Sequence, residues 1–159
     1  MRIMLFALLL ITKFSTAQPA VVNDYIKAHL PSWQLCRNED YPASFWSFYS
    51  RESLPFFTAV DINDDNRVDY GVLIRQRQEI RLLIILSDHA GYTHYLSDTL
   101  AGTTLDYCLL PAPPGRIDIA FPAISSLILT ANGINLMKME NRMCIYYWNG
   151  ASIDIFKTL

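Results

Sequence analysis

The sequence predicts an α+β, mostly β protein in which antiparallel meander sheets follow one short N-terminal helix. Three observations lead to this prediction. Residues 19–30 repeat apolar side chains at helical spacing, residues 80–87 form a continuous apolar run, and the last third of the chain alternates apolar runs with turn sequences. Strands that succeed one another through short turns form antiparallel sheets.

The helix is expected between Pro19 and Pro31. Proline is tolerated in the first turn of a helix and ends one that has already formed. Val22, Tyr25 and Ile26 recur three and four residues apart, so they share one face that packs on the rest of the protein.

From Phe56 onward the pattern is typical of strands. The run IRLLIILS, residues 80–87, has no polar alternation, which is typical of a central strand covered on both faces. Asn132-Gly133 and Asn149-Gly150 each separate two apolar runs, and Asn-Gly is the strongest short signal for a hairpin turn. Hairpins are therefore expected at both positions.

The first seventeen residues have the features of a secretory signal peptide. Arg2 precedes an apolar run from residue 3 to 11, and the small residues Ser15 and Ala17 provide a cleavage site. That run of nine residues is short beside the roughly 20 that a membrane-spanning helix needs. We therefore expect a secreted or periplasmic protein whose residues 18–159 form a single globular domain with no membrane span.

Removal of residues 1–17 would leave 11 basic residues against 15 acidic ones, a balance that argues against a nucleic-acid partner. Three cysteines, Cys36, Cys108 and Cys144, would remain in an oxidising compartment. A Cys36–Cys108 bridge is the favoured pairing, because Cys144 lies within an expected strand. Three buried thiols that pack as small hydrophobic side chains are the alternative.

The segment DINDDNRVD, residues 61–69, places oxygen ligands at alternate positions between two expected strands. Calcium takes six to eight oxygen ligands, and a tight loop supplies them from alternating side chains and a main-chain carbonyl. Asp61, Asn63 and Asp65 match the first, third and fifth places of such a loop, the carbonyl of Arg67 the seventh, and Asp69 the ninth. These residues predict a Ca²⁺ site.

Asn66 stands at the sixth place, where these loops turn sharply, and asparagine is the residue after glycine that best adopts a left-handed conformation. Val72 stands where a helix-loop-helix site has its bidentate glutamate, which argues against an EF-hand. With strands on both sides, residues 57–74 resemble the strand-loop-strand calcium turns of FG-GAP and VCBS repeats. The turn occurs once, so the propeller architecture of those repeats is not implied.

The order of this loop, a meander and a final YYWNG hairpin resembles small secreted bacterial proteins that carry one such repeat, most of which lack an assigned function. The alternative for the loop is a solvated turn in which Asp and Asn cap main-chain amides without an ion. Mutual repulsion of Asp61, Asp64, Asp65 and Asp69 favours the ion, since neutral residues would serve a plain turn equally well.

No nucleophile elbow, zinc motif or phosphate-binding loop occurs in the sequence. Aromatic residues make up 13% of the chain, and those outside the core would be contacts for a protein or a sugar, of which a protein partner is the one expected. The candidate contacts are Trp46, Phe48, Tyr146 and Trp148.

The expected function is that of an exported, non-catalytic binding protein with one structural calcium ion. A periplasmic inhibitor or immunity-type protein and an envelope adaptor fit equally well, and the oligomeric state stays open. A small secreted hydrolase that uses the calcium loop as a scaffold is the alternative.

Overall fold

The computed structural model describes residues 20–102, 104–119, 124–139 and 141–158, and the predicted signal peptide lies outside these ranges. The helices are α1 (Ala20–His29) and the 3-10 helices η1 (Asn38–Asp40) and η2 (Phe45–Ser47). The strands are β1 (Gln34–Leu35), β2 (Phe57–Val60), β3 (Asp69–Gln76), β4 (Glu79–Asp88), β5 (Gly91–Leu96), β6 (Tyr107–Ala112), β7 (Gly115–Ile119), β8 (Ser125–Leu129), β9 (Gly133–Lys138), β10 (Asn141–Trp148) and β11 (Ile153–Lys157).

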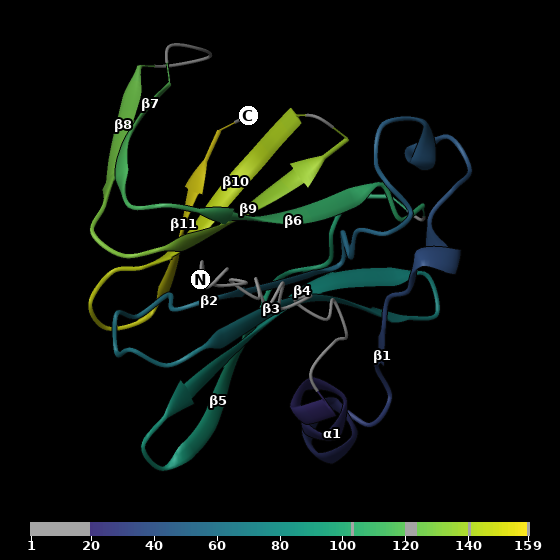
Figure 1. Cartoon of the computed structure of the whole chain (residues 1–159), viewed down its shortest axis with the longest axis horizontal. Coiled ribbons are helices and arrows are strands. Elements are labelled where there is room, and N and C mark those ends of the chain that lie inside the picture. Colours follow the sequence, from purple (N-terminus) through teal and green to yellow (C-terminus); the bar gives the residue numbers. More distant parts are fainter. Residues whose placement is uncertain (1–19, 103, 120–123, 140, 159) are drawn as a thin grey trace, which may run out of the picture.

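The strands form two main sheets and a separate hairpin (Figure 1). The first sheet has the order β1-β3-β4-β5, with β2 also paired to β3, and the second has the order β11-β10-β9-β6. Within the described ranges, strands β7 and β8 form a sheet of two strands. Every pairing is antiparallel, which confirms the predicted mostly β, antiparallel fold with one N-terminal helix.

Strand β4 is buried on both faces, as its continuous apolar sequence predicts. Leu82 and Ile84 point into the main core, which lies between the two sheets. Leu83 and Ile85 point to the opposite face, where they pack in the cluster that contains α1. Successive strand residues face opposite sides, so a strand between two apolar layers needs apolar residues at every position.

Helix α1 covers the outer face of the first sheet (Figure 1). Val22, Tyr25 and Ile26 are buried against the sheet, which confirms the predicted apolar face. The helix ends at His29, and the amide of Leu30 still donates to the carbonyl of Ile26 at 2.8 Å before Pro31. No α-helix among the residues described is both long and apolar enough to cross a membrane.

One of the two predicted Asn-Gly hairpins is present. At Asn149-Gly150, strands β10 and β11 pair directly, and Gly150 has a φ of +99°. The hairpin predicted at Asn132-Gly133 is wrong, because β8 pairs with β7 whereas β9 pairs with β6 and β10. A Cβ atom on Gly133 would lie 2.9 Å from the carbonyl oxygen of Tyr146, so this glycine permits a close approach of two strands.

The three cysteines are free and buried. Cys36, Cys108 and Cys144 all belong to the core between the sheets. The favoured Cys36–Cys108 bridge is therefore wrong for this structure, and the thiols pack as small hydrophobic side chains.

Candidate functional site

The acidic loop connects two paired strands of the first sheet. The pairing of β2 with β3 ends where Val60 lies opposite Asp69, so residues 61–68 form the connection between them. Asp64 and Asn66 adopt left-handed conformations, with φ of 59° and 63°. This confirms the conformation expected for Asn66, and aspartate and asparagine are the side chains that tolerate it best.

Asp61 organises the loop from within. Its Oδ1 accepts from the amide of Asp65 at 3.1 Å, and its Oδ2 accepts from the amide of Asn66 at 2.8 Å. Its main-chain carbonyl also accepts from Nδ2 of Asn132, 3.2 Å away in the connection before β9. The carboxylate of Asp61 thus stabilises the turn of the loop through two main-chain amides. Asn132 links the loop by a hydrogen bond to a segment far away in the sequence.

Asn63 and Asp65 lie together in the loop. Nδ2 of Asn63 donates to Oδ2 of Asp65 at 3.3 Å, and the amide of Arg67 donates to Oδ1 of Asp65 at 2.9 Å. Oδ1 of Asn63 is buried and has no hydrogen-bond partner among the described residues. An acceptor withdrawn from water without a partner costs free energy, so this atom is a place for a cation or another donor.

Asp69 points into the protein and is fully buried. Its Oδ2 accepts from the amide of Ile62 at 3.0 Å, and its Oδ1 accepts from the amide and hydroxyl of Ser87 at 2.8 and 3.1 Å. The carboxylate therefore fastens the loop to β4. Burial raises the pKa of Asp69, and the hydrogen bonds from Ser87 and Ile62 oppose that rise.

The residues present fit a hard cation with a reduced ligand set. Asp61, Asn63 and Asp65 offer side-chain oxygens within one loop, and the carbonyl of Arg67 remains a ligand predicted from spacing. Asp69, predicted as the ninth-place ligand, points into the protein and is fully buried, with three hydrogen bonds to its two oxygens. The oxygens of Asp61 and Asp65 accept one hydrogen bond each, so each keeps a lone pair for an ion. Across the described ranges, no group of three or more His, Cys, Asp or Glu side chains is arranged to hold a metal. An ion here would rest on two carboxylates and neutral oxygens.

The side chain of Arg67 lies against the turn between β4 and β5. Its Nη2 is 2.7 Å from Nδ1 of His89. A guanidinium group can only donate, so Nδ1 of His89 accepts and the ring carries its proton on Nε2. This contact joins the acidic loop to the neighbouring turn.

The four predicted partner contacts do not form one surface. Phe48 is 60% exposed, Trp46 is half-buried in the same segment, and Tyr146 is only 4% exposed within the core. Trp148 is half-buried at the end of β10, and Figure 1 places the β10–β11 turn at the opposite side of the molecule from η2. Phe48 and Trp46 are therefore the pair that a single partner could contact.

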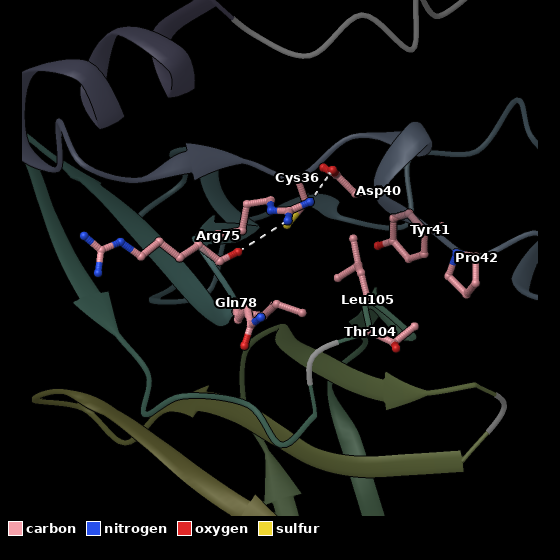
Figure 2. A pocket seen from close by; sticks show the side chains of 10 residues that line it. Cys36, Asp40, Tyr41, Pro42, Arg75, Gln78, Thr104 and Leu105 are labelled. Atoms are coloured by element: carbon pink, nitrogen blue, oxygen red, sulfur yellow. Dashed lines mark hydrogen bonds and ion pairs between the residues drawn. The ribbon is translucent and has the colours of Figure 1, made fainter.

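A cavity of about 260 Å³ opens beside Cys36, Asp40, Tyr41 and Arg75 (Figure 2). Arg75 forms an ion pair with Asp40 and donates to the carbonyl of Arg77 at 3.3 Å. Burial raises the pKa of Cys36 to about 12, the carboxylate of Asp40 adds to the rise, and Arg75 opposes it. The thiol is protonated at neutral pH and is a weak nucleophile.

The sequence pattern did not single out this cavity. Asp40 and Arg75 lie 35 residues apart, and neither belongs to a motif. Only the pairing of β1 with β3, which sets Gln34 opposite Arg75, brings their segments together.

Comparison with protein-family models, curated proteins and solved structures finds no match to this chain. The resemblance of residues 57–74 to FG-GAP and VCBS calcium turns therefore stays a prediction from the sequence.

Proposed function

We propose that the protein is an exported, non-catalytic binding protein whose acidic loop is stabilised by one calcium ion. The observation that supports the calcium ion is the buried Oδ1 of Asn63, which lies beside the carboxylate of Asp65 and has no hydrogen-bond partner in the part of the chain that the structure describes. A cation at this point would satisfy that oxygen and offset the charges of Asp61, Asp64 and Asp65. Secreted proteins also meet calcium at concentrations that a weak site can use, with a Kd of about 0.1 to 1 mM.

The proposed role of the ion is structural. Asp61, Asn63, Asp65 and the carbonyl of Arg67 would hold it, while Asp69 anchors the loop to β4 through Ser87 and Ile62. When bound, calcium supplies positive charge that holds oxygen ligands in place. The hydrogen bonds already present would then fix the turn between β2 and β3, and with it the neighbouring turn through Arg67 and His89.

The proposed partner contact is the aromatic segment around η2. Phe45 is buried, and Trp46 packs partly against the core with the guanidinium of Arg51 5.4 Å from its ring centre. Phe48 is left 60% exposed beside them. A rigidly supported, exposed aromatic ring is the kind of side chain that dominates interface energetics. An inhibitor or immunity-type protein and an envelope adaptor would both use such a contact.

A retention experiment tests the proposal. Purified protein is immobilised and exposed to cell-envelope extract, and we expect it to retain a specific protein partner. Phe48→Ala should weaken binding of that partner by about 2 kcal/mol or more, roughly thirtyfold, because it removes an interface anchor. Ile128→Ala, at a side chain that is 70% exposed on the β7–β8 hairpin, is the matched control and should bind normally.

Activity assays on the same preparation test the hydrolase alternative. We expect no turnover of ester, peptide, glycoside or phosphodiester substrates. Two results together would overturn the proposal. One is reproducible hydrolysis that disappears on Cys36→Ser or on substitution of a single Ser, His or Asp residue. The other is normal partner binding by Phe48→Ala.

A further inference from the structure

A second surface, separate from the acidic loop, has the character of a binding site. It is an open groove of about 810 Å³ between the C-terminal half of α1, the edge strand β1 and the end of β3 with its following turn. We call it the basic groove. The side chains that give it its character are Lys27, Trp33, Arg37, Asp40, Arg75 and Arg77.

The charge of the basic groove is opposite to that of the whole chain. The chain has 13 basic and 15 acidic residues, whereas the described lining of the groove has four basic side chains and one acidic side chain. The acidic one, Asp40, is paired with Arg75. Lys27, Arg37 and Arg77 have no ion-pair partner within the described ranges. Cationic side chains gathered in one concave surface attract an anionic ligand.

The arrangement of these cations favours an extended ligand over a small anion. Lys27 lies in the last turn of α1, Arg37 follows β1, and Arg77 is in the turn after β3. They come from three separate elements along the groove, and all three residues are exposed. Because all three line the same groove, a ligand that carries several anionic groups in a row would present a charge to each element.

Strand β1 provides the second observation. This strand of two residues pairs with β3 through Gln34 opposite Arg75 and Leu35 opposite Ile74, and among the described residues it is at the edge of its sheet. An edge strand presents main-chain amides and carbonyls with which another extended chain can pair. Trp33, half-buried immediately before β1, adds an aromatic contact.

We propose that the basic groove binds an acidic, extended segment of a protein partner. Its main chain lies along β1, and its Asp and Glu carboxylates pair with Lys27, Arg37 and Arg77. Extension of a sheet by a peptide strand supplies affinity through main-chain hydrogen bonds, and flanking charges supply specificity. The inference rests on the proposed binding function and names the chemistry of the partner.

Fluorescence anisotropy with a labelled oligoglutamate peptide tests the groove directly on purified protein. We expect saturable binding that weakens as salt is raised, because exposed charges are screened. The double variant Arg37→Glu/Arg77→Glu should bind at least about tenfold more weakly. Arg116→Glu/Lys157→Glu makes the same change in net charge at exposed positions on β7 and β11, and it should bind within about twofold of the unaltered protein. Lys27→Glu, on α1, is a second and independent groove variant and should also weaken binding.

Three results would overturn the basic groove as an acidic-peptide site: no saturable binding of oligoglutamate, equal weakening in both double variants, or tighter binding of single-stranded DNA of the same length. The retention experiment separates this inference from the proposed function. Retention of the envelope partner by Arg37→Glu/Arg77→Glu at full affinity contradicts the groove and leaves the binding function standing. Oligoglutamate binding that depends on Arg37 and Arg77, without any retained partner, supports the groove and contradicts the proposed function.

Discussion

Asp69→Ala is expected to lower the free energy of unfolding by about 3 to 5 kcal/mol, because it leaves three buried hydrogen-bond donors without an acceptor at about 1 to 3 kcal/mol each, less what local relaxation recovers. The substitution leaves the amides of Ile62 and Ser87 and the hydroxyl of Ser87 without their acceptor. Because Asp69 is fully buried, water cannot replace the lost carboxylate without opening the structure. The loss should appear as a lower midpoint in urea denaturation followed by tryptophan fluorescence.

Two variants control this result. Asp98→Ala removes an exposed carboxylate and should change the free energy of unfolding by less than about 0.5 kcal/mol. Asp69→Asn keeps the shape of the side chain and one acceptor oxygen, but its NH₂ group faces donors that the second carboxylate oxygen accepted from. Its loss of stability should therefore lie between those of Asp69→Ala and Asp98→Ala. Asp69→Ala and Asp98→Ala with equal midpoints would show that Asp69 does not anchor the loop.

Calcium is expected to stabilise the folded protein by about 1.4 kcal/mol at ten times its Kd and about 2.7 kcal/mol at a hundred times, if it binds only the folded state. The melting temperature should rise accordingly. Asp61→Ala and Asp65→Ala should abolish that increment, because each removes a proposed ligand. Both side chains also accept main-chain hydrogen bonds, so both variants should lose stability even without calcium. The quantity to compare is therefore the gain in stability that calcium adds to each variant.

Asp64→Asn is the matched control for this measurement. It removes the same charge from the same loop, and asparagine suits the left-handed conformation of Asp64, whose φ is 59°. Asp64 is exposed and stands at an even position of the loop, so the calcium response should largely remain. Equal loss of the response in all three variants would show that general charge, and not directed coordination, explains it.

Local sequence patterns were enough to predict the main elements of the fold. The continuous apolar run of β4 required a strand covered on both faces, and Leu82 and Leu83 do face opposite clusters. The helical spacing of Val22 and Ile26 likewise predicted the buried face of α1. In both cases the side chains that decide the structure are close neighbours in the sequence.

Positions decided by long-range contacts were harder to predict. Asn132 bonds to the carbonyl of Asp61, 71 residues away, and does not form a hairpin turn. The burial of Tyr146 illustrates a second difficulty. Its strand is apolar on both faces, with Tyr146 in the main core and Ile145 in the cluster beneath the β7–β8 hairpin, so alternation alone could not indicate an exposed side.

The candidate site was predicted in part. The turn conformation of Asn66 followed from loop spacing, whereas the inward orientation of Asp69 depends on Ser87, 18 residues later on β4. The basic groove carries no local signal, because Lys27, Arg37 and Arg77 meet only after α1, β1 and β3 have packed together. The groove is basic whereas the net charge of the chain is negative, so the overall composition does not indicate the groove.

A crystal structure of the protein grown with calcium would test the central claim most directly. We predict one strong anomalous peak in the acidic loop, with side-chain oxygens of Asp61, Asn63 and Asp65 and the carbonyl of Arg67 at about 2.3 to 2.6 Å from it. Oδ1 of Asn63, which lacks a protein partner among the described residues, should be among those ligands. The calcium concentration in the crystal should be far above about 1 mM, the weakest Kd proposed for the site. Only water at this position under that condition would contradict the proposal of a structural calcium site.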